Sequence, residues 1–513
     1  MARKEVTMKE ITLKNLTLVL DTLAICEKYT NACHVLNYDE ETICPKKAME
    51  NQGETISFLS NKAFELTKSD DFVNAANYLY EHRDELDYED KVLAEGLRRN
   101  YMRTRNISVE QDLEFSKIFN KAFVDWLEAK NKADFSIFKD SLNKVRETQL
   151  EQFELSDYDG ERPKTAYNAL LDAYERGVTT DEIDMAFNAF KERITPLLSK
   201  IKSSKKKIRT DFLSREVTDE QQRRMAEYLL DVIHFDKSRG AITTTEHPFT
   251  DNLAKDDARI TTHYYPTAFT SSMFSVIHEG GHALFMQLQP EEDYPHFNND
   301  SQSMAMHESV SRFYENRIGR SREFIHLIFP KCKEIFPQVF SDVTEEEFYE
   351  AINVVEPSLI RTEADEFTYT FHIIIRYELE KALVDGNIPI DDKLPERWND
   401  LYEKYLGIRP SNDKEGLLQD VHWASGFGYF QAYAIGNMYN AMYYNKMKED
   451  IDISKAISEG DFDLINGWMA EHVFKKANYL APMDWIKDIT GREFTPDDFL
   501  DYLTDKYTRL YEI

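Results

Sequence analysis

Apolar residues recur every three to four positions through most of the chain, a period typical of amphipathic α-helices. Residues 187–202, "FNAFKERITPLLSKIK", and 371–383, "FHIIIRYELEKAL", are two such segments. Helix start signals accompany the pattern: Thr179 and Thr344 each precede a Glu three residues on, as in a capping box. Pro496 is expected at a first helical position. The pattern predicts a mostly α fold.

One region departs from the helical period. Residues 238–266, "SRGAITTTEHPFTDNLAKDDARITTHYYP", are rich in β-branched and aromatic residues with turn formers between them. Such composition predicts a small sheet, with "RITTHYY" (259–265) as one strand. We expect this sheet to lead directly into the next helix.

Length and charge narrow the class of protein. Length alone allows two to four domains. No Gly/Ser-rich linker, fixed-period repeat or low-complexity run divides the sequence, so we predict one continuous domain, 1–513, in two lobes around a groove, with a helical part at about 1–235 and a second part at about 236–513. The net charge of −30 disfavours nucleic acids and anionic membranes as partners. Four cysteines do not form a disulfide framework, and the N-terminal segment lacks a signal-peptide core, so we expect a cytoplasmic protein.

The helix after the sheet contains "HEGGH", an H-E-x-x-H pattern. His278 and His282 are four positions apart and therefore share one helical face, where two neutral imidazoles can bind a divalent metal. Glu279 lies about 100° around the helix, from where it can reach a water at the metal without being a ligand. These residues predict a zinc site with a general base. Paired surface histidines on a core helix are the alternative.

A third protein ligand is needed to leave one coordination position open for water. Glu308, in "SMAMHESVSRFYENRIG", is the favoured candidate because two His plus one carboxylate is a known peptidase ligand set. His307 and His296 remain alternatives. Gly281 is expected to allow close approach of a second helix or of the substrate, and Gly280 to permit tight packing behind the helix.

Several motifs appear in an order that resembles the carboxypeptidase Taq family of metallocarboxypeptidases. They are "HPFT" (247–250), "DARITT" (257–262), "HEGGH" (278–282), "HESVSR" (307–312), "IRTEADE" (360–366) and "GLLQDVHWASGFGYF" (416–430). The N-terminal "LNYDEETICP" (36–45) also resembles a family motif, with Tyr38 where Trp is usual and Cys44 where Met is usual. Two further positions differ from the usual family residues: Val310 replaces Gln, and Gln431 replaces Pro. The likeness covers nearly the whole chain.

The resemblance implies a cytoplasmic zinc carboxypeptidase that removes single C-terminal residues with broad specificity, in which cobalt can substitute for zinc. It implies a mostly helical two-lobed body around a deep groove, similar to neurolysin and angiotensin-converting enzyme, with a small sheet next to the zinc helix. It also implies a homodimer. The expected partners are peptides with a free C-terminus, and neither nucleic acid nor membrane.

Catalytic roles follow from the chemistry and the resemblance together. Glu279 would take a proton from the attacking water and deliver it to the leaving amine. His422 and Tyr429 are the expected oxyanion donors, with Tyr433 as a reserve. Trp423 is expected in the core.

An exopeptidase must recognise a free carboxylate, for which arginine is best suited. Arg361 is the first choice by resemblance and Arg259 the second, and His247 is placed with them in the substrate site. Alternatively, either arginine forms a structural ion pair, with Asp365 or Asp257 respectively; Asp365 is also a candidate partner that orients a ligand histidine. Two rival functions are a zinc oligopeptidase or endopeptidase of the same fold, and a non-catalytic metal-binding helical protein.

Overall fold

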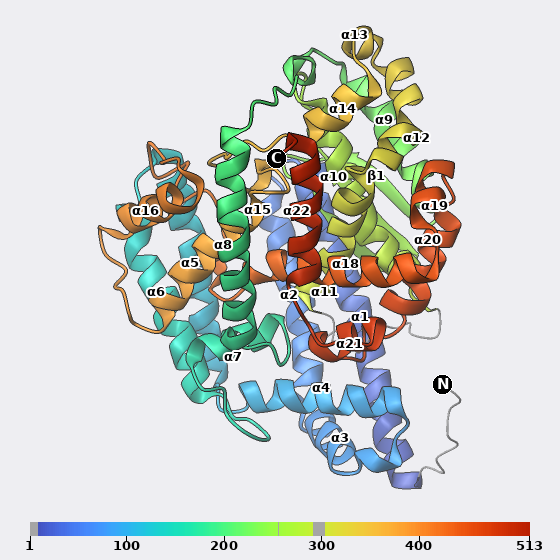
Figure 1. Ribbon diagram of the computed structural model, residues 1–513. Coiled ribbons are helices and arrows are strands. Elements are labelled where there is room, and N and C mark those ends of the chain that lie inside the picture. The colour runs from blue at the N-terminus through green and yellow to red at the C-terminus, as the bar shows by residue number, and fades with distance from the viewer. Residues whose placement is uncertain (1–8, 255, 291–302) are drawn as a thin grey trace.

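The computed structural model describes residues 9–254, 256–290 and 303–513 (Figure 1). Most of these residues are helical, as predicted. The helices before the sheet are α1 (Glu10–Thr42), α2 (Met49–Thr67), α3 (Asp70–Glu81), α4 (Tyr88–Thr104), α5 (Val109–Lys132), α6 (Ser136–Leu155), α7 (Ala166–Tyr174), α8 (Thr180–Ser203) and α9 (Asp219–Val232).

The helices after the sheet begin with α10 (Phe269–Gln287) and α11 (Met304–Arg312), which continues into the π-helical segment η5 (Phe313–Gly319). The remaining ones are α12 (Arg322–Ile335), α13 (Pro337–Phe340), α14 (Glu345–Ile352), α15 (Tyr369–Val384), α16 (Leu394–Leu406), α17 (His422–Ser425), α18 (Gln431–Asp450), α19 (Ile453–Glu459), α20 (Phe462–Met469), η7 (Ala470–Phe474), α21 (Pro482–Thr490) and α22 (Asp497–Tyr511). Short 3₁₀ turns lie at η1 (Arg83–Glu85), η2 (Asp211–Ser214) and η6 (Arg361–Glu363).

Local start signals place helix ends well. Thr179 and Thr344 both form the predicted capping boxes, at the start of α8 and α14. Pro496 lies one position earlier than predicted, as the residue before α22 rather than its first. α15 also differs, because it is buried on nearly all sides instead of along one stripe. Its buried side chains include His372, Arg376 and Glu380.

The predicted sheet has three strands, β1 (Gly240–Thr244), β2 (Thr250–Ala254) and β3 (Asp257–Thr262), in the order β1-β3-β2. β1 pairs with β3 in parallel, and β2 pairs with β3 antiparallel, with Thr250 opposite Ile260. The predicted strand was placed two residues late: residues 263–265 lie beyond β3, where the His263 Nδ1 atom lies 2.7 Å from the Thr245 carbonyl.

Within residues 9–254, 256–290 and 303–513, the buried apolar side chains form two separate cores. The larger runs from Ala122 to Tyr511 and combines side chains from before and after the sheet. The smaller belongs to α1, α3 and α4, and its central residues include Leu16, Phe72 and Leu93. In Figure 1 these three helices, together with α2, form the blue part of the chain, with α3 and α4 at its lower end.

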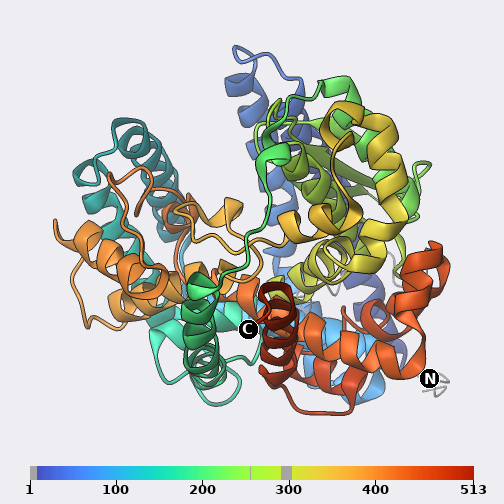
Figure 2. The same cartoon turned by 45° about the horizontal axis from the view of Figure 1, so that its top comes forward.

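The helix that carries the two histidines, α10, packs against the sheet on one side and against α9 and α11 on others. Figure 2 shows the helices around the sheet, in green and yellow, on one side of the molecule, and α5, α6 and α16, in teal and orange, on the other. No helix among the described residues is both long and apolar enough to cross a membrane.

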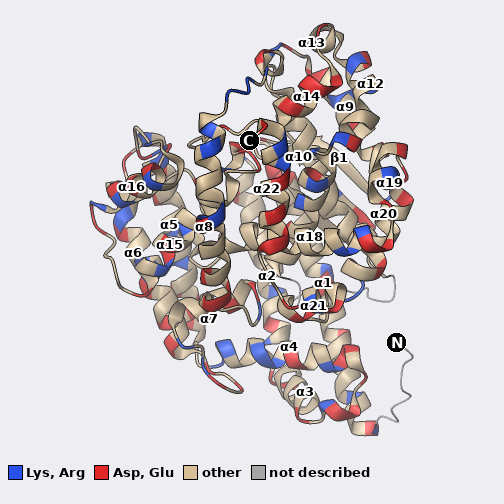
Figure 3. Ribbon diagram, in the orientation of Figure 1, with Lys and Arg blue, Asp and Glu red and all other residues tan. Residues whose placement is uncertain are grey.

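Basic and acidic residues are interspersed along the helices, as the blue and red segments of the ribbon in Figure 3 show. The basic stretch after α8 is engaged in ion pairs: Lys206 Nζ lies 2.7 Å from Glu350, and Arg209 Nη2 lies 2.6 Å from Asp342. Of the four cysteines, all free, Cys44 is half-exposed and the other three are buried.

Candidate metal centre and active site

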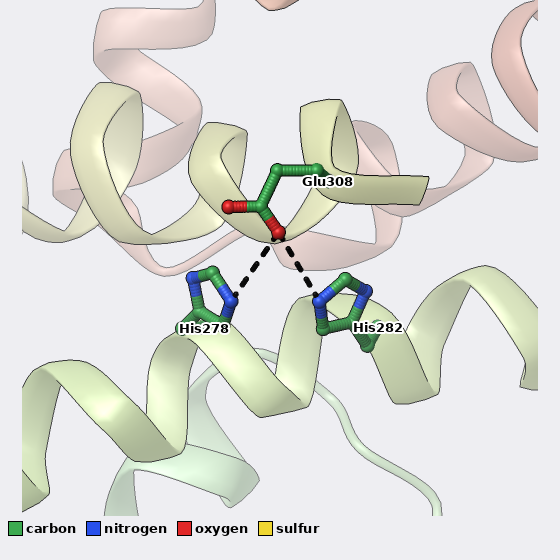
Figure 4. Close-up of side chains that lie close together, drawn as sticks. All are labelled: His278, His282 and Glu308. Carbon is green, nitrogen blue, oxygen red and sulfur yellow. Dashed lines mark ion pairs between the residues drawn. The ribbon is translucent and has the colours of Figure 1, made fainter. Parts of the chain in front are cut away.

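His278 and His282 project from one face of α10 towards Glu308 on α11 (Figure 4). The Nε2 atoms of both histidines lie 3.6 Å from the Glu308 Oε2 atom. The ligating atoms of the three residues all lie within 4.8 Å of one another, and no other such group of His, Cys, Asp and Glu occurs in the part of the chain that the structure describes.

The spacing fits a divalent metal. Two ligand atoms at tetrahedral positions, each about 2.0–2.1 Å from zinc, are roughly 3.3 Å apart. The two 3.6 Å separations are close to that value, so an ion can bind with little movement of the side chains. Three protein ligands also leave one position open, as catalytic rather than structural metal sites do.

Each ligand histidine is held through its other ring nitrogen. His278 Nδ1 lies 2.9 Å from the Glu315 Oε2 atom, and His282 Nδ1 lies 2.9 Å from His307 Nδ1. Such outer contacts fix the ring orientation and the tautomer, and they leave both Nε2 atoms directed at the metal position. Burial lowers the pKa of His307 to about 3, so this ring is neutral.

Glu308 is held as a carboxylate in a site that is 6% exposed. Burial alone raises its pKa, but Arg312 and the two histidines outweigh this effect and keep the pKa well below its usual range. The Arg312 Nε atom donates to the Glu308 Oε1 atom at 2.7 Å, which leaves Oε2 directed at the histidines. Arg312 also contacts Glu315, so one guanidinium links both acidic residues.

The two glycines of "HEGGH" have different neighbours. A Cβ atom at Gly281 would lie 2.8 Å from the Ser311 Cα atom, so this glycine permits the close approach of α10 and α11. A Cβ atom at Gly280 would meet the Ile233 side chain at 2.5 Å, behind the helix against α9. Both arrangements agree with the sequence-based interpretation. Gly436 on α18 allows an equally close approach to α11 from another direction.

The alternative third ligands are placed differently. His307 contacts His282 instead of joining the group of ligating atoms. His296 lies outside the described residues. Glu315, which sequence reasoning missed, follows Glu308 by seven positions and therefore shares its face of the helix, a spacing that offered a usable signal.

A family model described as carboxypeptidase Taq (M32) metallopeptidase matches residues 19–507. The chain belongs to this family. "Carboxypeptidase 1" of Bacillus subtilis (strain 168) is 39% identical over 96% of this chain and 97% of the relative. "Thermostable carboxypeptidase 1" of Pyrococcus furiosus is 36% identical over 93% and 95% of the two chains. The protein is accordingly a metallocarboxypeptidase, and its family implies a metal. His278, His282 and Glu308 form a group that could hold such an ion.

Solved structures of the family agree. The structure of the Pyrococcus furiosus carboxypeptidase matches with a TM-score of 0.90 at 34% identity, covering 98% of this chain and 100% of that one. The M32 carboxypeptidase of Deinococcus radiodurans R1 matches with a TM-score of 0.92 at 29% identity, with the same coverage. The family fold thus extends over nearly the whole chain.

Glu279, which follows His278 on α10, is 7% exposed. Its Oε2 atom lies 2.7 Å from the Thr250 hydroxyl on β2, and its backbone carbonyl lies 2.9 Å from the same hydroxyl. The sheet therefore contacts the side chain next to the metal ligands. No sequence signal identified Thr250 as a partner of Glu279.

Arg361 is buried and pairs with Asp420 rather than with Asp365, contrary to the expected alternative. Its Nε and Nη2 atoms lie 3.1 and 2.9 Å from the Asp420 Oδ1 atom, and Nη1 donates to the Tyr369 hydroxyl at 3.1 Å. Arg376 binds the other oxygen of Asp420. Two guanidiniums thus share one carboxylate, and this group carries a net positive charge.

A chain of contacts joins this arginine pair to the metal ligands. The Arg312 guanidinium, which binds Glu308, lies 4.1 Å from the centre of the Tyr369 ring. The hydroxyl of the same tyrosine accepts from Arg361 Nη1 at 3.1 Å. Three contacts, Arg361 to Tyr369, Tyr369 to Arg312 and Arg312 to Glu308, therefore join the arginine pair to the candidate metal ligands.

His422 and Tyr429 lie beside each other, with ring centres 5.1 Å apart. His422 Nε2 lies 3.3 Å from the Tyr433 hydroxyl. Burial, with Arg361 nearby, lowers the pKa of His422 to about 4, so the ring is neutral at physiological pH. Burial raises the pKa of Tyr429, so its phenol remains protonated and able to donate. Trp423 is buried in the core as predicted.

Glu380 on α15 binds the segment that contains His422 and Tyr429. Its carboxylate accepts from the Trp423 indole at 2.6 Å, the Gly428 amide at 3.1 Å and the Tyr167 hydroxyl at 3.1 Å. Three donors from two segments thus converge on one buried acid, which links the segment between Trp423 and Gly428 to Tyr167 on α7.

Three other residues predicted for the site, Arg259, His247 and Asp365, lie outside the contacts that link Arg361 to Arg312 and Glu308. Arg259 pairs with Asp257 on its own strand at 2.8 Å and stacks on Tyr38, the structural alternative foreseen for it. His247 is exposed in the β1–β2 connection. Asp365 accepts from Thr368 and from the Glu356 amide, and it contacts neither ligand histidine. Orientation of a ligand histidine therefore falls to Glu315 and His307 instead.

Two of the residues that differ from the usual family pattern, Val310 and Gln431, are both fully buried. The Gln431 amide nitrogen donates to the Gly428 carbonyl at the start of α18. Neither residue belongs to the group of His278, His282 and Glu308.

Proposed function

We propose that this metallocarboxypeptidase uses one zinc ion, held by His278, His282 and Glu308, to remove single C-terminal residues from peptides with broad specificity. The observation that supports zinc most directly is the convergence of two Nε2 atoms and one carboxylate oxygen at 3.6 Å separations. Nitrogen and carboxylate ligands in this ratio also suit cobalt, which we expect to substitute.

When bound, zinc supplies Lewis-acid polarisation of the scissile carbonyl and lowers the pKa of water. Glu279 takes a proton at a carboxylate oxygen from the attacking water and passes it to the nitrogen of the leaving amine. Its place beside His278 on α10 supports this role. Burial of the carboxylate excludes bulk water that would compete for the proton.

The developing oxyanion requires donors beside the metal. We assign these to the His422 ring and the Tyr429 hydroxyl, with Tyr433 as a reserve. A neutral imidazole and a protonated phenol both donate without adding charge to the resting site. The low pKa of His422 and the raised pKa of Tyr429 support the assignment.

Recognition of the free carboxylate is assigned to Arg361. Three of its donors are occupied by Asp420 and Tyr369, which leaves two N–H groups of the five for a substrate. The net positive charge of the Arg361–Asp420–Arg376 group favours an anion at this place. Arg259 and His247 are secondary candidates, as contacts further along the peptide.

We also propose a two-lobed body around a substrate groove, similar to neurolysin and angiotensin-converting enzyme. The placement of helices on either side in Figure 2 supports this arrangement. A homodimer is proposed from the family resemblance, and α2 supports it because none of its residues is buried within one chain. The four free thiols are compatible with a reducing cytoplasm.

The test compares a free peptide with its C-terminally amidated twin, alongside metal analysis of the purified protein. We expect one equivalent of zinc per chain and a product ladder that shortens by one residue at a time from the carboxyl end. The amidated twin should resist cleavage. Equal cleavage of both peptides, or internal cuts, would support the oligopeptidase alternative and contradict the role of Arg361.

A further inference from the structure

Thr250 is the residue of the sheet that contacts Glu279. Its hydroxyl lies 2.7 Å from the Glu279 Oε2 atom and 2.9 Å from the Glu279 carbonyl oxygen. A threonine hydroxyl has one hydrogen, so it donates to one of these acceptors at a time. The carboxylate contact is the shorter and is charge-assisted, which makes it the stronger.

The donor is held in place by the strands. Thr250 pairs with Ile260 of β3 at the start of β2. The preceding residue is fixed as well, because the Phe249 amide donates to the Thr261 hydroxyl at 2.8 Å. The Thr245 and Thr261 hydroxyls lie 2.8 Å apart and close the β1–β2 connection. As a β-branched residue in a strand, Thr250 also has restricted rotation about χ1.

α1 supports the same strand from another side. His34 Nδ1 on α1 lies 3.1 Å from the Asp251 carboxylate, next to Thr250. The Tyr38 and Phe249 rings meet edge to face with their centres 5.9 Å apart. The hydroxyl of Thr250 is therefore part of a rigid surface and not of a free loop.

We propose that Thr250 is a positioning residue that fixes the carboxylate of Glu279 for proton transfer. The terminal torsion of a glutamate is broad, so a carboxylate without a partner samples many orientations. A donor on Oε2 selects one orientation and leaves the other oxygen for the reacting proton. Small errors in such geometry are costly in rate. The inference rests on the proposed role of Glu279 as general base.

The experiment compares Thr250→Val, which keeps the shape and removes the hydroxyl, with Thr250→Ser, which keeps the hydroxyl. Thr243→Val on β1 is the matched control, since its hydroxyl does not contact Glu279. We expect kcat to fall by about 10- to 100-fold in Thr250→Val, with KM unchanged. This is the usual effect of removing a hydrogen-bond partner of the residues around a metal site. The kcat of Thr250→Ser and of Thr243→Val should remain within about 3-fold of that of the natural protein, because both variants keep a hydroxyl beside Glu279.

Two readouts besides activity separate positioning from a structural role. Zinc affinity, measured by competition with a chelator, and the unfolding temperature of the metal-free protein should be unchanged in Thr250→Val. A loss of either in proportion to kcat, or a Ser variant as slow as Val, would overturn the proposal. Should Thr250→Val not fold, Thr250→Ala against Thr250→Ser provides the same comparison.

Glu279→Gln, assayed in parallel, separates the proposed role of Glu279 as general base from the proposed role of Thr250 as its positioning residue. If it keeps the natural rate, the base assignment fails and the role of Thr250 fails with it. If Glu279→Gln is inactive while Thr250→Val keeps full kcat, only the positioning role is wrong.

Discussion

Gly281 on α10 lies so close to Ser311 on α11 that a Cβ atom added to the glycine would be 2.8 Å from the Ser311 Cα atom. Because that neighbour is backbone, Gly281→Ala must separate the two helices that carry the metal ligands. We expect a destabilisation of about 1–3 kcal/mol from overpacking, reduced by the roughly 1 kcal/mol gained in helix propensity. Metal affinity should fall as well.

Gly280→Ala is the matched control for that prediction. Its added Cβ atom meets the end of the Ile233 side chain, which can rotate away. Urea unfolding and zinc titration of both variants measure the difference. Equal zinc affinity in the two variants would show that the spacing between α10 and α11 does not govern the metal site.

Glu279→Gln removes the proposed base while keeping the size of the side chain. We expect zinc content per chain to be unchanged and the hydrolysis rate to fall by roughly 10²–10⁴-fold, the usual contribution of general acid–base catalysis. Metal analysis and steady-state kinetics on one preparation provide the measurement. A rate near that of the natural protein would remove Glu279 from the mechanism.

Glu315→Gln tests the contact that holds His278. The amide keeps an acceptor but loses the negative charge beside the His278 Nδ1 atom. We expect zinc to bind about 10- to 100-fold more weakly, as for other outer contacts of ligand histidines. Glu308→Gln, which removes a ligand charge itself, should lose more affinity than Glu315→Gln in the same chelator competition. The reverse order would exclude Glu308 as a ligand.

Arg361→Lys tests carboxylate recognition, since lysine keeps the charge but loses the planar fork. We expect KM for a free peptide to rise by about 10-fold, equivalent to about 1.4 kcal/mol, and discrimination against the amidated twin to shrink. Arg259→Lys is the comparison, because Arg259 pairs with Asp257 within the sheet. A larger KM effect in Arg259→Lys would reverse the order of the two assignments.

Glu175 predicts a pH dependence of stability. It is fully buried after α7, accepts from the Ala305 amide at 2.7 Å near the start of α11, and burial raises its pKa from 4.5 to about 8. The folded chain therefore retains a proton that the unfolded chain releases. Protonation of Glu175 therefore stabilises the folded chain. Its contribution to the free energy of unfolding is complete below the pKa of the unfolded chain and is lost as pH rises through about 8.

The measurement is urea unfolding of the natural protein and Glu175→Gln at pH 5.5 and 8.5. We expect the natural protein to lose up to a few kcal/mol relative to the variant at the higher pH. Glu175→Gln keeps a neutral acceptor for the Ala305 amide. Its stability at the two pH values therefore shows the pH dependence of the rest of the protein. Parallel pH dependence in both proteins would show that Glu175 is ionised in the folded state.

Local signals in the sequence predicted local structure. The capping residues Thr179 and Thr344 begin the helices they were assigned to, because a cap depends on residues three positions apart. The spacing of His278 and His282 likewise placed two ligating atoms on one helical face. Glu308 was predicted as the third ligand because two His plus one carboxylate is a known peptidase ligand set.

Contacts between distant segments were not predictable in this way. The pairing of Arg361 with Asp420 joins residues 59 positions apart, and the contact of Glu175 with Ala305 spans 130. Both depend on how helices pack, and periodicity carries no information about that. β3 was displaced for a related reason: β-branched and aromatic residues continue past Thr262, but the chain leaves the sheet there.

The separate apolar core of α1, α3 and α4 has a consequence for how the protein unfolds. Units with their own core open as cooperative foldons, each with its own free energy. Amide hydrogens in these helices should therefore exchange with solvent as a group, sooner than those of α10 and α18. Release of α1 would also free Asp251 from His34, so an opening event at the N-terminus reaches the strand beside the metal.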